Sequence, residues 1–139
     1  MCDGRTITVT TGEGMRTICH LDRTIFENTF GPLNTDEVVI TDERILHIQR
    51  HHPMDYALFE QCAEAVITRP DIIVEDGNNP FTVLMIGRSD TANLNVVLRL
   101  SVAASDPPEH RNSVMTFFRI REKNLIKLMR RNKVLYKRG

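Results

Sequence analysis

The sequence predicts an α+β fold in which N-terminal helices pack on an antiparallel β-meander, followed by a basic C-terminal helix and strand. Two observations predict the order of the elements. Apolar residues recur at helical spacing over residues 42–68, and from residue 71 onward short apolar runs alternate with tight turns rich in Gly, Asn, Asp and Pro. Helices followed by a run of short strands are typical of the α+β class. A chain of 139 residues is expected to form a single domain.

The first forty residues carry the weakest signals. Residues 1–15 are rich in Thr and Gly and are expected to be a frayed terminus or a loose edge strand. Residues 15–21 read as a short strand and residues 30–37 as a loop. We therefore treat residues 1–37 as a poorly defined N-terminal extension of a core that spans residues 38–138.

Two helices are expected after this extension. Thr41 or Asp42 supplies the N-cap of the first, and Pro53 should interrupt it near His52, because proline lacks an N–H and disfavours helix in its predecessor. The second helix is expected over residues 54–68.

The C-terminal half is expected to hold the meander. The predicted strands cover residues 71–75, 81–87, 94–104 and 113–121. In the last of them, simple alternation places one set of side chains on a common face: Val114, Thr116, Phe118 and Ile120. A helix beginning around Asn124 and a short strand at residues 133–137 should complete the fold.

The net charge of zero hides a strong asymmetry. Residues 111–138 hold ten Lys and Arg against the single acid Glu122, whereas residues 1–110 hold eight basic and seventeen acidic side chains. Such a chain can present a basic surface to an anionic partner. The alternative is that the basic C-terminal segment neutralises acidic neighbours within its own fold.

The composition predicts a cytoplasmic protein without a membrane partner. No apolar run approaches the roughly 18 residues that span a bilayer, and the first residues lack the layout of a signal peptide. The three cysteines are odd in number, widely spaced and without a CxxC pair, which favours a reduced setting over a disulfide framework. Cys62 is expected to fill the core.

Residues 42–53, DERILHIQRHHP, hold three of the five histidines. His47 and His51 are four apart, which is the spacing of two zinc ligands on a helix. The residue after the first His is Ile48 rather than Glu, and no third ligand stands out, so we expect no metal. A structural interpretation remains, in which His47 is hydrogen-bonded in the core and the other histidines are solvated.

The same segment suits metal-independent RNA cleavage. Attack of a ribose 2′-hydroxyl on the adjacent phosphate needs a base, an acid and cations around the phosphorane, but no cofactor. The sequence offers His47 and His52 as proton carriers and Arg44, Arg99 and Arg119 as charge stabilisers. Thr116 could donate a hydrogen bond, and the aromatic ring of Tyr136 could stack on a base. The Gly-rich phosphate loop, the GxSxG motif, paired metal-binding acids and the dinucleotide fingerprint of other enzyme classes are missing.

Five segments in order resemble the phage-associated nuclease domains of the barnase–EndoU–colicin–RelE class: ITDERILHIQRHHP, RPDIIVED, NLNVVLRL, NSVMTFFRIREK and KVLYKR. Those domains run a T-x-x-R-x-x-H-I … H-P helix into a P-D-x-I segment, a meander, a T-F-(F/W)-R strand and a terminal Y-K. The resemblance covers residues 38–138. It implies a barnase/RelE-like arrangement, metal-independent RNase activity, and a role as a toxin or effector carried by phages and other mobile elements.

The resemblance also implies site residues. Arg44, His47 and His52 match the helix motif, and Thr116 and Arg119 match the late strand motif, whereas His51 has no counterpart. We therefore hypothesise an endoribonuclease in a bacterial host cytoplasm that acts on tRNA or mRNA and is paired with an inhibitor or immunity protein. Its expected substrate-binding residues are Arg50, Arg99, Lys123, Lys127 and Tyr136. The alternative is a non-catalytic RNA-binding or protein-interaction module with the same fold.

Overall fold

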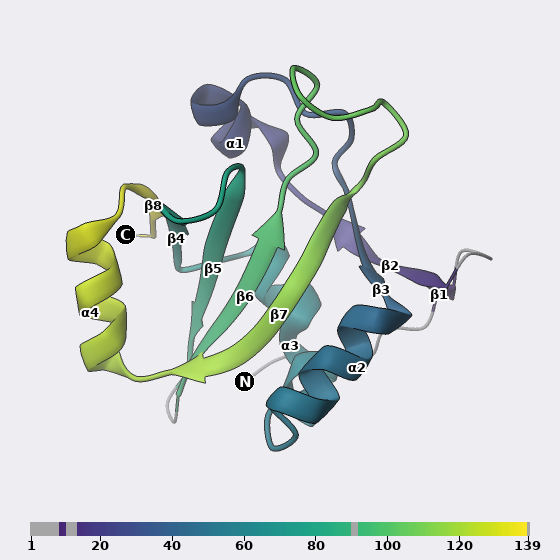
Figure 1. Cartoon of the computed structure of the whole chain (residues 1–139). Helices are drawn as coiled ribbons and strands as arrows, with labels where there is room; N and C mark the ends of the chain where they lie inside the picture. The colour runs from purple at the N-terminus through teal and green to yellow at the C-terminus, as the bar shows by residue number, and fades with distance from the viewer. Residues whose placement is uncertain (1–8, 11–13, 90–91, 139) are drawn as a thin grey trace.

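The computed structural model describes residues 9–10, 14–89 and 92–138 and confirms the α+β class (Figure 1). In chain order the elements are β1 (Val9–Thr10), β2 (Met15–His20), α1 (Arg23–Phe30), β3 (Glu37–Thr41), α2 (Asp42–His51), α3 (Tyr56–Thr68), β4 (Ile72–Glu75), β5 (Thr82–Arg88), β6 (Asn93–Arg99), β7 (Asn112–Ile120), α4 (Glu122–Arg131) and β8 (Val134–Lys137).

One mixed sheet organises the described part of the chain. Its strand order is β1-β2-β3-β7-β6-β5-β4-β8. The run β4–β7 is the expected antiparallel meander. One pairing was not expected: β7, the last strand of the meander, lies parallel to β3. The connection between these two strands runs through α2, α3 and β4–β6. The sheet is therefore larger than the predicted meander and is not purely antiparallel.

Helices cover both faces of the sheet. On one side, called here the α3 face, Phe59 and Val66 of α3 pack with Val96 and Phe117 of the sheet, and Figure 1 shows α3 behind the strands. On the other side, the α4 face, Leu125 of α4 is fully buried in a smaller cluster with residues of β4, β5 and β7. Sequential strand residues alternate between the faces, so the two cores share the sheet.

The start of α4 is tied to the meander by polar contacts. Glu122 accepts a hydrogen bond from Arg88 at 2.7 Å and another from Asn93 at 2.9 Å. These contacts hold the first turn of α4 against the ends of β5 and β6. The helix therefore stands along the α4 face at a defined place, on the left in Figure 1.

The first predicted helix is confirmed. Thr41 is the N-cap of α2, and its side chain accepts a hydrogen bond from the backbone N–H of Arg44 at 3.2 Å. Ile48 is fully buried and anchors the helix. The helix ends at His51, and His52 is the C-cap, in agreement with the expected effect of Pro53. α2 thereby places its last turn beside β7.

Residues 15–37 are not the poorly defined extension that we expected. β2 pairs with β3, and α1 contributes the buried Phe26 to the main core. α1 begins at an N-cap whose carboxylate, that of Asp22, accepts from the N–H of Thr24, and it ends before Gly31, whose φ of 81° suits glycine. Residues 1–8 and 11–13 lie outside the described residues.

The predicted face of β7 is partly wrong. Thr116 pairs with Val97, but Val114 pairs with the next residue, Leu98, so Met115 is the extra residue of a β-bulge. The bulge reverses the alternation, and Val114 joins the core under α3. Thr116 and Phe118 keep the α4 face.

Candidate functional site

Three histidines gather where α2 ends. His47 and His51 lie one turn apart with ring centroids 4.6 Å from each other, and the ring of His52 is 6.4 Å from that of His47. The backbone N–H of His52 donates to the carbonyl of Ile48 at 2.8 Å, which continues the helical hydrogen-bond pattern to the C-cap and keeps His52 next to the last turn of α2. His51, which the spacing paired with His47 only as a possible zinc ligand and which has no counterpart in the nuclease motif, lies beside His47.

The surroundings of His47 favour the neutral form of its imidazole. Burial lowers the pKa of His47 below 6.5, and the positive charges of His51, Arg44 and His52 lower it further. Arg44, a predicted site residue, thus lies close enough to act on His47 electrostatically. An imidazole that is neutral at pH 7 is available to accept a proton.

His52 connects this cluster to the sheet. Its ring stacks on Phe118 of β7, with centroids 5.3 Å apart and planes inclined by 28°. Thr116 lies two residues before Phe118 on the same face, and Asn95 is the cross-strand neighbour of Phe118 in β6. The histidine cluster therefore meets the late part of the strand motif TFFR.

Buried polar atoms without partners lie on this face. Within the part of the chain that the structure describes, the hydroxyl of Thr116 and both side-chain polar atoms of Asn95 are buried and make no hydrogen bond. Asn95 is fully buried. Such groups are uncommon in folded proteins because each loses its hydration without replacement, and they often mark functional positions. Asn95 was not predicted as a site residue, although an amide side chain within an otherwise apolar strand is unusual.

A basic groove opens on the other side of Phe118. It has a volume of about 540 Å³, in the range of ligand sites, and lies between the end of β7 and α4. Its lining is aromatic, aliphatic and cationic: Phe118, Arg119, Ile120, Arg121, Asn124, Lys127, Leu128 and Arg131. Lys127 was predicted; Arg121 and Arg131 were not. Phe118 is the residue that the groove and the histidine cluster share.

Several predicted site residues lie elsewhere. The Arg119 side chain forms an ion pair with Asp55, 2.6 Å between Nε and Oδ1. Arg99 pairs with Asp106 at 3.1 Å and sits over the ring of Phe81 at the opposite end of the strands. Both arginines are therefore held by carboxylates. Arg99 lies away from the histidines, whereas Arg119 also lines the groove.

The remaining predicted residues are not gathered at the site either. Tyr136 belongs to the edge strand β8 and packs against the main core on the α3 face. Arg50 and Lys123 are exposed on α2 and α4 and do not line the groove. The structure thus brings together His47, His52 and Arg44, with Thr116 and Lys127 on the adjoining face.

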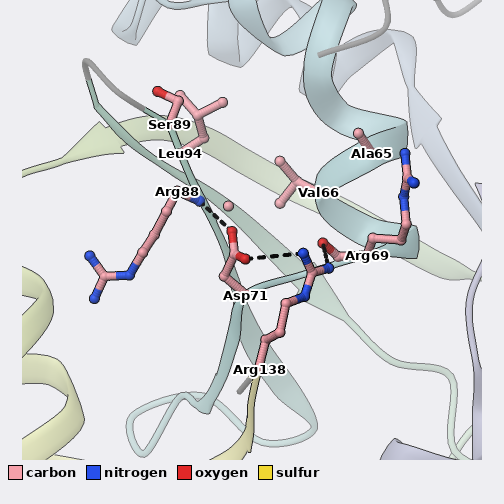
Figure 2. A pocket seen from close by; sticks show the side chains of 9 residues that line it. Ala65, Val66, Arg69, Asp71, Arg88, Ser89, Leu94 and Arg138 are labelled. Carbon is pink, nitrogen blue, oxygen red and sulfur yellow. Dashed lines mark hydrogen bonds and ion pairs between the residues drawn. The ribbon is translucent and has the colours of Figure 1, made fainter. Parts of the chain in front are cut away.

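A second pocket lies at the end of α3 and β5 (Figure 2). Two of its three arginines, Arg88 and Arg138, are engaged by carboxylates. Asp71 accepts from the N–H of Arg88 at 2.7 Å and pairs with Arg138 at 3.4 Å, while Arg138 also donates to the carbonyl of Arg69 at 2.9 Å. The guanidinium of Arg88 points away, toward Glu122. This arrangement fastens β8 to the loop before β4.

Comparisons with known proteins add no relative. A scan of protein-family models, a search of curated proteins and a search of solved structures each find no match to this chain. Among the described residues, no group of three or more His, Cys, Asp or Glu side chains is arranged to hold a metal ion. None of the described helices has the length and apolar character that crossing a bilayer requires.

Proposed function

We propose that this protein is a metal-independent endoribonuclease whose site spans the end of α2 and the groove beside α4. The observation that carries the proposal is the stack of His52 on Phe118, because it joins a histidine cluster to a basic groove. Proton carriers and cations around one phosphodiester are the minimum that 2′-hydroxyl attack requires. The contact also joins the two halves of the motif order that resembles the barnase–EndoU–colicin–RelE class.

The proposed reaction uses the histidines in two roles. His47, whose pKa is lowered, takes the proton of the 2′-hydroxyl while O2′ attacks the adjacent phosphorus. His52 in its protonated form gives a proton to the leaving O5′ as the P–O5′ bond breaks. The products are a 2′,3′-cyclic phosphate and a 5′-hydroxyl. His51 contributes charge next to His47 rather than a separate proton transfer.

The remaining groups bind and stabilise charge. Arg44 lies beside His47, and Lys127 and Arg131 line the groove, where cations can hold the phosphates that flank the cut. Thr116, whose hydroxyl makes no hydrogen bond within the described residues, is the proposed hydrogen-bond donor to the RNA. Aromatic rings such as Phe118 offer a surface for an unpaired base.

The biological part of the proposal follows the resemblance. We assign the protein a barnase/RelE-like arrangement, a bacterial host cytoplasm, tRNA or mRNA as substrate, and a role as a phage or mobile-element toxin that an inhibitor restrains. The polarised charge supports an anionic partner, since residues 111–138 carry a net charge of +9 in the sequence.

The experiment compares histidine variants on labelled RNA in EDTA. His47→Ala and His52→Ala should each lower kcat by about 10²–10⁴-fold, the usual contribution of acid–base catalysis. His20→Ala is the matched control, because His20 lies on β2, is exposed and is hydrogen-bonded to Asp36. It should retain full activity. The unfolding temperature of all three variants is measured in parallel.

The outcomes separate the alternatives. Loss of activity in His47→Ala with an equal loss of folding would assign His47 a structural role and count against the proposal. Wild-type protein that binds RNA with a steep salt dependence but leaves it intact would favour the non-catalytic binding module.

A further inference from the structure

We infer that Asp55 and Arg119 are positioning residues that hold His52 against Phe118. The inference rests on the proposed function for its kinetic consequence, but its structural part can be tested without RNA. It reassigns Arg119, which sequence motifs placed at the phosphate, to a bond behind the site.

Both oxygens of the Asp55 carboxylate are bound by one residue. Nε of Arg119 donates to Oδ1 at 2.6 Å, and the backbone N–H of Arg119 donates to Oδ2 at 3.2 Å. The carboxylate is only 12% exposed. A charge-assisted pair that also uses the backbone is more rigid than an ordinary surface ion pair, because it fixes the strand as well as the side chain.

The same aspartate is bonded to His52. The backbone N–H of Asp55 donates to the carbonyl of His52 at 2.9 Å, and the carbonyl of Asp55 begins α3 by accepting from Phe59. The turn 52–55 is thus fastened to β7 at Arg119, and the next residue back along that strand is Phe118, on which His52 stacks. Two contacts on adjacent residues of one strand therefore set the position of the imidazole.

The use of Asp55 departs from its ordinary role. An aspartate at an N-cap normally accepts a hydrogen bond from the first turn of its helix. Asp55 is the N-cap of α3, yet its side chain makes no capping bond and is turned to Arg119 instead. The helix forgoes that stabilisation, which indicates that the bond to β7 serves a different end from starting α3.

The test replaces Asp55 by Asn, which is an equally good N-cap and should preserve α3. In wild-type protein we expect the ring current of Phe118 to shift the His52 ring protons upfield, because the two rings are stacked. In Asp55→Asn we expect these NMR resonances to move toward the values of a free histidine. On RNA, kcat should fall by about 100-fold, the cost of a misplaced catalytic group, while KM stays within about twofold.

Asp106→Asn is the matched control. Asp106 is 11% exposed and accepts from both terminal guanidinium nitrogens of Arg99 and from the backbone N–H of Val102, at the far end of the strands. It should lower the unfolding temperature to a similar degree and leave both the His52 resonances and kcat unchanged. If Asp55→Asn does not fold, Arg119→Gln removes the side-chain bond from its more exposed partner. Its primary readout is the His52 resonances, because Arg119 also lines the groove.

The inference is overturned if a folded Asp55→Asn or Arg119→Gln keeps the wild-type His52 resonances and kcat. It is also overturned if Asp106→Asn changes both to the same degree, since the effect would then be general loosening of the fold. Absence of RNA cleavage by the wild-type protein would contradict the proposed function, and the NMR comparison would still decide the positioning role.

Discussion

At the scale of single residues, the proposed reaction depends on the protonation state of His47. Its pKa is lowered by burial and by the neighbouring charges of His51, Arg44 and His52. At pH values between this lowered pKa and 6.5, His47 is therefore less protonated in the folded protein than in the unfolded chain. This contribution makes folding less favourable as the pH falls through that window, and it has no effect above it.

An Arg44→Ala variant tests this electrostatic account. Removing the guanidinium should raise the pKa of His47, since a like charge no longer opposes protonation. An NMR titration of the histidine ring protons should place the wild-type midpoint below 6.5 and the variant midpoint higher. The acidic limb of the kcat/KM profile should move with it. Arg50→Ala on the same helix is the control and should leave the midpoint in place; a wild-type midpoint at or above 6.5 would contradict the account.

The sequence identified part of the site at this scale. The residue types and spacing of 42–53 suggested His47, His52 and Arg44, and a helix ending at Pro53 does bring them together. Arg99 was chosen by residue type and Arg119 also by its match to the strand motif, and no local pattern shows that each is held by an aspartate. Arg119 and Asp55 are 64 residues apart.

At the scale of elements, α4 combines an apolar side with a cationic one. Leu125 is fully buried against the sheet, while Lys127 and Arg131 line the groove. Arg130 is exposed and is not among the groove residues. The helix therefore anchors itself through one stripe and presents charge over Phe118 through another.

Neutralising the groove cations should weaken RNA binding. We expect Lys127→Gln and Arg131→Gln, made in the inactive His47→Ala background, each to reduce the slope of log affinity against log salt by about 1. Arg130→Gln provides the control on the same helix and should change the slope less. Fluorescence anisotropy with a short labelled RNA at several salt concentrations measures this. Equal effects of all three substitutions would indicate a diffuse basic surface rather than the groove.

Some elements were predictable and others were not. Helices α2 and α3 followed from apolar spacing and Pro53, and the meander followed from its turns. α1 was missed although its signals are present: Asp22 as N-cap, Gly31 after the last turn and the buried Phe26 between them. The bulge at Met115 could not be foreseen, because it depends on the register that β6 imposes on β7.

At the scale of the whole molecule, part of the charge asymmetry is neutralised within the fold. Arg111 pairs with Glu37 and Arg138 with Asp71, so part of the basic C-terminal segment does neutralise acidic neighbours. Among the described residues, no ion pair includes Lys127 or Arg131. Part of the positive charge that remains unpaired therefore lines the groove beside α4. The parallel pairing of β3 with β7 places α2, which follows β3, next to β7. The two strands are far apart in the sequence, so no local sequence pattern predicts this pairing.

The central claim is that this arrangement cleaves RNA without a metal ion, and the ends of the products test it most directly. Purified wild-type protein is incubated with a defined RNA in EDTA, and the new 3′ termini are identified by mass spectrometry. The account predicts 2′,3′-cyclic phosphates, because O2′ is the nucleophile. RNA that stays intact across a broad panel, cleavage that requires a divalent metal, or products ending in a 3′-hydroxyl would contradict it.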